Sequence, residues 1–130
     1  MSTLISFTER ELLRGKVVPP TWYRMRIEFV GEAPSKDQGS TNYPVEAIIE
    51  FDAGTGDKEH AGIPITWNFN SKALGFAVGF FEALGQEVEP GVRLDLKGAE
   101  GKSLDVYVEN DTWQGRVVNR VNHKYRQIQS

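Results

Sequence analysis

The sequence predicts a mainly β domain, a five-stranded barrel with a single helix between the third and fourth strands. Five segments alternate apolar and polar residues and are rich in β-branched and aromatic side chains. One segment between the third and fourth of these has helical periodicity instead. Clusters of Gly, Pro, Ser and Asn separate the segments. The 130 residues suit one domain, which we place at 21–130 behind an N-terminal arm at 1–20.

Composition restricts the class of protein. Hydrophobic residues make up 39% and charged residues 25% of the chain, as in soluble globular proteins. Cysteine is absent, which excludes disulfides, thiolate metal sites and cysteine nucleophiles. No apolar run approaches the roughly 18 residues needed to span a membrane, and the N-terminus lacks the apolar run of a signal peptide. A cytoplasmic protein with no membrane partner is therefore expected.

The arm and the first strand follow from local signals. Thr8 stands three residues before Glu11, the spacing of a capping box, so a short helix is expected there. Pro19 and Pro20 then stop any helix. The strand "TWYRMRIEFV" at 21–30 has an apolar face formed by Tyr23, Met25, Ile27 and Phe29. Its other face carries Trp22, Arg24, Arg26 and Glu28.

The second and third strands and the helix complete the first half of the domain. The apolar face of the second strand is expected to carry Val45, Ala47, Ile49 and Phe51, and that of the third Ile63, Ile65, Trp67 and Phe69. Pro64 makes the third strand an edge strand or marks its start. The helix, at 71–85, has an expected buried stripe of Leu74, Ala77, Val78, Phe81 and Leu84.

Two strands end the chain. "SLDVYVEN" turns Leu104, Val106 and Val108 inward and Tyr107 to the polar side. "DTWQG" is typical of a turn, with Trp113 at its tip. The final strand, at 116–127, presents three cations in one phase: Arg116, Arg120 and Lys124.

This order of elements is the plan of the OB-fold. In that fold the helix plugs one end of the barrel, and strand one can pair with strand four. Ligands bind to the face of strands two and three and to the loops after strands one and four, here 31–43 and 109–115.

The strongest functional constellation is one for single-stranded nucleic acid, which needs cations for phosphates and flat rings for bases. We expect five cations to contact phosphates: Arg24, Arg26, Arg116, Arg120 and Lys124. The rings expected to stack on bases are Trp22, Tyr107 and Trp113. For Arg120, cross-strand pairing with Asp105 and Glu109 is an equal alternative.

Catalytic signals are weak. No nucleophile elbow, P-loop, zinc-protease or paired-carboxylate motif occurs. Asp57, Glu59 and His60 could in principle hold a metal ion, but clustered loop residues are normally solvated. A protein that is not an enzyme and needs no cofactor or metal is therefore expected.

Several motifs together resemble small phage-encoded single-stranded-DNA-binding proteins. These are "VVPPTWYRMRI", "SKALGFAVGFFEALG" and "LKGAEGKSLDVYVENDTWQGRVVNRVNHKYR", which cover most of residues 15–126. The resemblance implies an OB-fold that protects single strands in phage replication or recombination, in the host cytoplasm, with replication or recombination proteins as possible partners. Bacterial single-strand binders end in an acidic tail that recruits partners, whereas this chain ends in "YRQIQS". Recruitment through such a tail is not expected.

Sequence reasoning leaves two functional alternatives to DNA binding open. One is a phage structural β-barrel that oligomerises through apolar surface, and the other is an adaptor whose basic strand meets an acidic protein. The sequence decides neither the oligomeric state, with a homo-oligomer possible, nor a preference for DNA over RNA.

Overall fold

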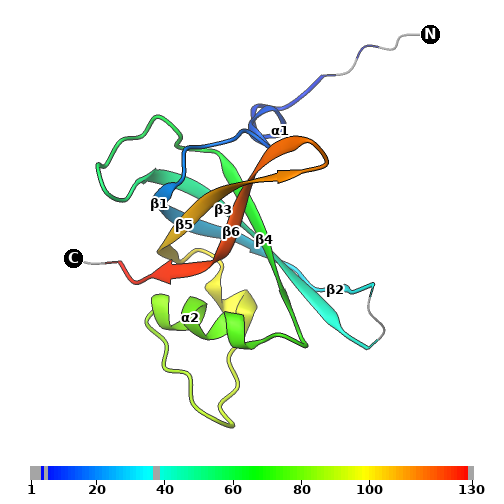
Figure 1. Ribbon diagram of the computed structural model, residues 1–130. Coiled ribbons are helices and arrows are strands. Elements are labelled where there is room, and N and C mark those ends of the chain that lie inside the picture. The colour runs from blue at the N-terminus through cyan, green and yellow to red at the C-terminus, as the bar shows by residue number, and fades with distance from the viewer. Residues whose placement is uncertain (1–3, 5, 37–38, 129–130) are drawn as a thin grey trace.

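The computed structural model describes residues 4, 6–36 and 39–128 (Figure 1). Its strands are β1 (Thr21–Val30), β2 (Ala33–Pro34), β3 (Thr41–Asp52), β4 (Pro64–Asn70), β5 (Ser103–Trp113) and β6 (Arg116–Arg126). Its helices are α1 (Glu9–Leu13), α2 (Gly75–Ala83) and the short 3₁₀ helix η1 (Leu96–Ala99). The predicted mainly β class is confirmed, as is the order of three long strands, a helix and two long strands.

All six strands belong to one antiparallel sheet. Their order is β2-β3-β1-β5-β6, and β4 pairs with the remaining edge of β3. The expected pairing of the first long strand with the fourth is confirmed by β1 and β5. The sheet is not closed into a barrel, because no described residue of β4 is hydrogen-bonded in register with β6.

Aromatic side chains fill the seam between β4 and β6. The Tyr125 ring of β6 lies 6.2 Å from the Trp67 ring and 6.3 Å from the Phe69 ring of β4, measured between centroids. Helix α2 adds Phe80, whose ring is 5.4 Å from that of Tyr125. Rings of this size hold the two backbones too far apart for N–H···O=C bonds, which explains why the sheet stays open.

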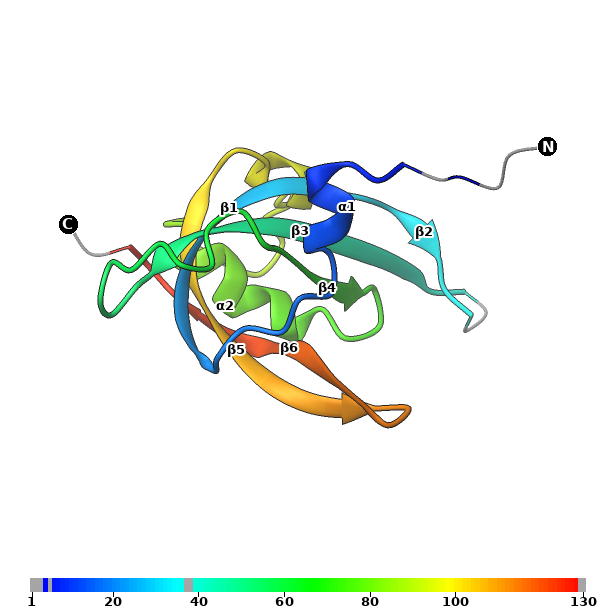
Figure 2. The ribbon, with the colours of Figure 1, turned by 90° about the horizontal axis from the view of Figure 1, so that it is seen from above.

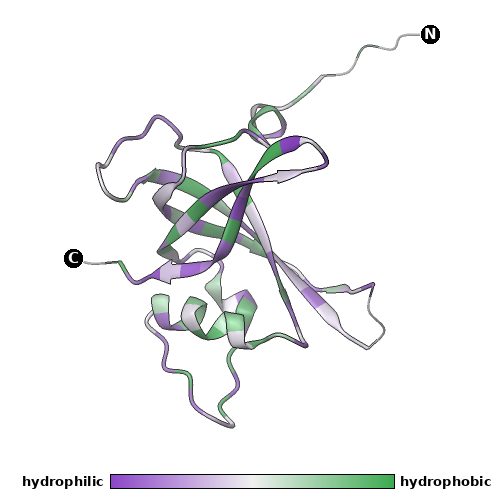
Figure 3. Cartoon of the chain, in the orientation of Figure 1, coloured by the Kyte–Doolittle hydropathy of each residue, from purple (hydrophilic) through white to green (hydrophobic). Residues whose placement is uncertain are grey.

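The hydrophobic core lies between the curved sheet and α2. Hydrophobic and hydrophilic residues alternate along β5 and β6, while α2 is mostly hydrophobic (Figure 3). Trp67 and Phe69 are buried, as predicted. The predicted helix stripe is partly wrong: Phe80 is fully buried, whereas Leu74 and Val78 are exposed. The helix turns its Phe80 side toward the aromatic seam, which periodicity alone could not indicate. None of the described helices is long and apolar enough to cross a membrane.

Two β-bulges overturn predicted side-chain directions. Glu28 is an extra residue between the pairs Ile27–Ala47 and Phe29–Glu46, so Phe29 points outward and is 52% exposed. A second bulge at Glu50 shifts the end of β3, and Phe51 is therefore only partly buried. The prediction that Phe29 and Phe51 lie on apolar faces is wrong, because each bulge moves its residue to the other side of the sheet.

The N-terminal arm packs on its own domain. Thr8 is confirmed as the N-cap of α1, since the Glu11 N–H donates to Thr8 Oγ1 at 3.2 Å. Further along, the Val18 N–H donates to Asn119 Oδ1 at 2.9 Å, and Asn110 Nδ2 donates to the Val18 carbonyl at 2.9 Å. Asn119 also donates to the carbonyl of Lys16 at 2.7 Å. These two asparagines, paired across β5 and β6, therefore fix the arm beside the end of the seam distant from α2.

The β5–β6 hairpin is longer than predicted and its turn is shorter. β5 runs to Trp113, which pairs with Arg116, so only two residues form the turn. Gln114 and Gly115 have φ values of 50° and 76°, the left-handed conformation of a two-residue hairpin turn. The predicted loop at 109–115 is therefore mostly strand, and Figure 2 shows the hairpin projecting beyond the rest of the sheet.

Truncating the seam residue Tyr125 should strongly destabilise the fold. Tyr125→Ala removes a ring that packs on both β4 and α2, so the free energy of unfolding should fall by about 3 kcal/mol in urea titrations. Tyr125→Phe keeps the ring and loses the hydroxyl, whose oxygen lies 2.9 Å from His123 Nδ1. Tyr125→Phe should lower the free energy of unfolding by less than a third as much as Tyr125→Ala. Equal losses in the two variants would contradict a seam held together by packing.

His123 should make stability depend on pH. Its ring stacks on Phe76 at 4.6 Å between centroids, and burial, then the nearby Arg120 charge, lowers its pKa. Because the folded pKa lies below the unfolded value, the unfolded state binds the proton first as pH falls. The contribution of His123 to stability should therefore be complete well above the unfolded pKa of about 6.5 and should be lost as pH falls below it.

The control for this titration uses the unusual backbone of His123, whose φ is 55°. Asn tolerates this conformation, so His123→Asn should flatten the decline without severe backbone strain. His60→Asn should leave the decline of stability at low pH unchanged. An unchanged slope in His123→Asn would assign the pH dependence to other groups.

Candidate nucleic-acid interface

All eight predicted contact residues lie on one outer face of β1, β5 and β6. The strand register places Trp22 opposite Tyr107, and Arg24 opposite Asp105. On the hairpin it places Trp113 opposite Arg116. We call this surface the charged face, and its members are Trp22, Arg24, Arg26, Asp105, Tyr107, Glu109, Asp111, Trp113, Arg116, Arg120, Lys124 and Arg126. The basic residues of β1 and those of β6 therefore lie on one continuous surface.

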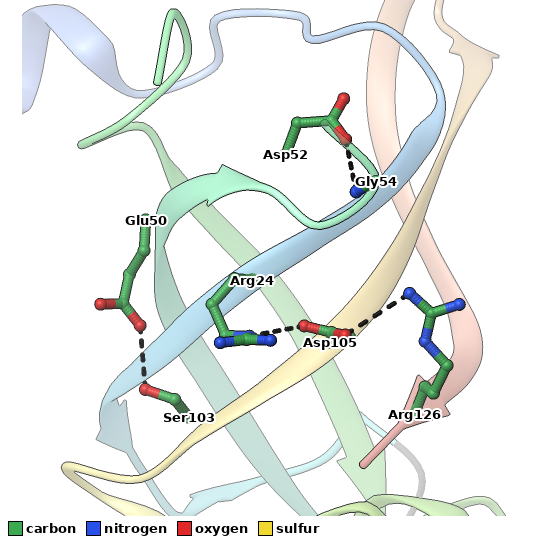
Figure 4. A network of polar contacts seen from close by, with 7 residues as sticks. All are labelled: Arg24, Glu50, Asp52, Gly54, Ser103, Asp105 and Arg126. Atoms are coloured by element: carbon green, nitrogen blue, oxygen red, sulfur yellow. Dashed lines mark hydrogen bonds and ion pairs between the residues drawn. The ribbon is translucent and has the colours of Figure 1, made fainter. Parts of the chain in front are cut away.

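A buried carboxylate lies at the centre of this face. Asp105 is only 4% exposed. Its Oδ1 is 2.7 Å from Arg24 Nε, and its Oδ2 is 3.4 Å from Arg126 Nη2 (Figure 4). Arg24 also lies over the Phe51 ring, 5.0 Å from its centroid. Arg24 is thus held by the fold, and this favours a structural role for it over the predicted phosphate contact.

Two aromatic rings sit beside this carboxylate, each with a cation close to it. Trp22 and Tyr107 meet edge to face at 5.5 Å between centroids. The Arg126 guanidinium lies 4.4 Å from the Trp22 ring centroid, and the Lys124 ammonium lies 5.4 Å from that of Tyr107. Arg126 was missed in the predicted site, although it has the same phase along the strand as Arg120 and Lys124.

Acids accompany most of the remaining cations. Arg120 Nη1 is 2.6 Å from Asp111 Oδ2, and this hydrogen bond, together with one from the Thr112 N–H, holds the pKa of Asp111 below its usual range. Arg120 therefore pairs diagonally with Asp111, and not with Asp105 or with Glu109, its register partner. Glu109 instead forms an ion pair with Lys124, whose Nζ lies 3.4 Å from Glu109 Oε1.

Arg26 is paired within its own strand. Its Nη2 is 2.6 Å from Glu28 Oε1, and this hydrogen bond raises the pKa of Arg26. Glu28 is the bulged residue of β1, so the same irregularity that exposes Phe29 supplies this partner.

The tip of the hairpin has the fewest ion pairs and ring contacts of any part of the charged face among the described residues. Trp113 is 63% exposed. Arg116, its register partner, makes no ion pair with any residue that the structure describes. An indole and a guanidinium are thus presented together to solvent.

The face that an OB-fold plan would use is different in chemistry. β3 and β4 contain no lysine or arginine. Their outer side carries an amide network in which Asn68 and Asn70 both donate to Asn42 Oδ1, at 3.0 and 2.8 Å. The arm reaches this face through Arg14, whose Nη2 is 3.1 Å from Glu46 Oε2. The cations of the sheet therefore lie on β1 and β6.

The alternative metal site does not assemble. Within the described residues, no three His, Cys, Asp or Glu side chains are arranged to hold a metal ion. His60 instead packs edge to face on Tyr23, 6.4 Å between centroids. Burial, with Asp52 and Glu59 nearby, raises the pKa of Tyr23 to about 12.

Comparison with known proteins adds no relative: no family model matches the sequence, and no curated protein is significantly similar to it.

Asp105 and Asp111 offer a matched test of the ion pairs. Asp105→Asn removes a buried charge that faces two arginines, so it should lower the free energy of unfolding by about 2 kcal/mol. Asp111→Asn makes the same change in an exposed pair and should leave stability nearly unchanged. Urea titration of the two variants measures both effects. If Asp111→Asn were the more damaging change, Asp105 would not be the structural centre of the face.

Proposed function

We propose that this protein binds single-stranded DNA with little sequence preference, through the charged face and the hairpin tip. The observation that carries the proposal is the tip itself, where exposed Trp113 and Arg116, which has no ion-pair partner among the described residues, continue a row of cations and aromatic rings. A ring for base stacking and a cation for the adjacent phosphate are the two contacts that single strands require. The setting would be phage replication or recombination in the host cytoplasm, as the sequence resemblance implies.

The strand order supports this proposal. The pairs β1–β3, β3–β4, β1–β5 and β5–β6, with α2 between β4 and β5, correspond to the plan of the OB-fold. That fold is a partly open Greek-key barrel, so the unpaired seam between β4 and β6 is compatible with it. Many single-strand binders use this architecture, although the architecture alone specifies no ligand.

Binding would proceed by exchange of anions. Arg120 and Lys124 are already bound to Asp111 and Glu109, so a phosphate must replace a carboxylate at each. Exposed ion pairs contribute little to stability, which makes this exchange feasible. Arg116 needs no exchange and would make the first contact. Trp113 would then stack on a base, and Trp22 and Tyr107 would offer further ring surface.

The decisive experiment removes a competing carboxylate. Asp111→Asn should raise the affinity for an oligothymidine about threefold, because Arg120 is then released for phosphate. Asp57→Asn removes one negative charge from an exposed loop outside the charged face and serves as the matched control. Fluorescence anisotropy at two salt concentrations measures both. If Asp57→Asn raised the affinity for the oligothymidine as much as Asp111→Asn, the effect would come from net charge and not from release of Arg120.

Two further variants separate stacking from charge. Trp113→Ala should lower affinity about tenfold and reduce quenching of tryptophan fluorescence. Arg116→Ala should lower the slope of log affinity against log salt by about 0.7, whereas Arg93→Ala, an exposed cation on the connector after α2, should not. If the wild-type protein bound no oligonucleotide at low salt, the proposal would fail in favour of an adaptor or structural role.

A further inference from the structure

A second surface lies at the end of the molecule opposite the hairpin tip. It is a groove of ≈ 970 Å³ between α2, the connector at 86–97 and the ends of β1 and β3. Figure 1 shows α2 and this connector at the bottom, with the tip of the β5–β6 hairpin near the top. The side chains that give the groove its apolar surface are Phe29, Leu74, Val78, Phe81, Val88 and Val92.

The apolar lining is unusually open to solvent. Phe29 is 52% exposed, Leu74 49% and Val92 53%. Leu74 and Val78 are four residues apart at the start of α2, so they form one ridge along the groove. Phe29 is turned into the groove by the bulge at Glu28. A contiguous apolar patch of this kind on a charged protein marks a binding surface.

The rim of the groove is acidic. Glu32 and Asp95 line it, and Glu87 and Glu89 flank Val88 in the connector, so these acids outnumber the one arginine there, Arg93. The one lysine in the lining, Lys97, is already held: its Nζ is 3.2 Å from Glu100 Oε2. Charge complementarity therefore favours an occupant with positive charges around an apolar stripe.

The groove offers no free strand edge. β3 is flanked by β2 and β4 at Asn42 and by β1 and β4 at 45–48. At the end of β1, the Val30 N–H donates to Glu100 Oε2 at 2.9 Å, and the Val30 carbonyl accepts from Lys97 Nζ at 3.3 Å. A bound segment cannot be added as a strand here, so its backbone groups must be satisfied internally, as in a helix.

From these observations we infer that the groove binds a cationic amphipathic helix of another protein. Apolar residues at i, i+3, i+4 and i+7 of that helix pack on Phe29, Leu74 and Val92. Its lysines or arginines meet Glu32 and the acids of the connector. The site is separate from the charged face, so occupation of one surface leaves the other accessible.

Two synthetic probes test this inference. Each is a leucine–lysine peptide of about 14 residues with the same composition, one with leucines at helical spacing and one with strict alternation. The helical peptide should bind the wild-type protein in fluorescence anisotropy, more weakly as salt increases, and the alternating peptide should bind at least tenfold more weakly. Equal binding of both peptides overturns the inference.

Matched variants locate the contact. Val92→Asn should weaken binding of the helical peptide about fivefold or more. Val117→Asn makes the same change at an equally exposed valine of the hairpin, 55% against 53%, and should have no effect. Glu32→Gln should weaken binding about threefold, and Glu59→Gln, in the loop before β4, should not. Identical affinities for Val92→Asn and Val117→Asn would place the peptide elsewhere.

Sedimentation of the protein alone tests the competing occupant, a second copy of this chain. A monomer in the wild-type protein is the expected result. A wild-type dimer that Val92→Asn converts to monomer would make the groove a self-interface and overturn the inference.

Discussion

The structure depends on how the seam between β4 and β6 is closed. Backbone hydrogen bonds do not join these strands in the described residues, so side-chain packing must hold the sheet in its curved shape. Tyr125 is at the centre of this packing because it contacts the aromatic residues of β4 and Phe80 of α2. Burial raises the Tyr125 pKa far above its ordinary value, which is typical of a residue used for packing.

Several irregular features follow from that constraint. Three residues of β6 stand opposite Tyr107 of β5, and this bulge gives His123 its left-handed backbone. The extra length brings the His123 ring between Phe69 and Phe76, at 5.4 and 4.6 Å between centroids. At the other end of the seam no aromatic cluster is available among the described residues, and there the Asn110–Asn119 pair holds the arm instead. The hairpin is therefore anchored at its base and along the arm, which leaves its tip free to project.

Sequence periodicity was sufficient to predict the long strands and their order along the chain, because apolar residues that alternate over ten positions cannot share one face of a helix. It could not locate single-residue bulges, and each bulge reversed every direction beyond it, as at Phe29. The same limit applied to the site. The eight residues were chosen by type and phase, and the structure brings them to one surface, but the partner of Arg120 was not predicted, because the predicted turn covered Asp111, which in fact lies in β5. Arg126 could have been predicted from phase alone, whereas the burial of Asp105 depends on three strands meeting.

The ion pairs of the charged face bear on what kind of ligand it can select. A cation that is held 2.6 Å from a carboxylate attracts a single small anion only weakly, since that anion must compete with a tethered partner. A polyanionic strand is different, because its phosphates are themselves linked and can replace several carboxylates in one event. Paired cations therefore favour long polyanions over free phosphate or nucleotides, whereas bare cations would bind both. In the proposed single-strand binding, the net charge of -3 would strengthen this discrimination, because long-range attraction would be weak and only close, multiple contacts would make binding favourable.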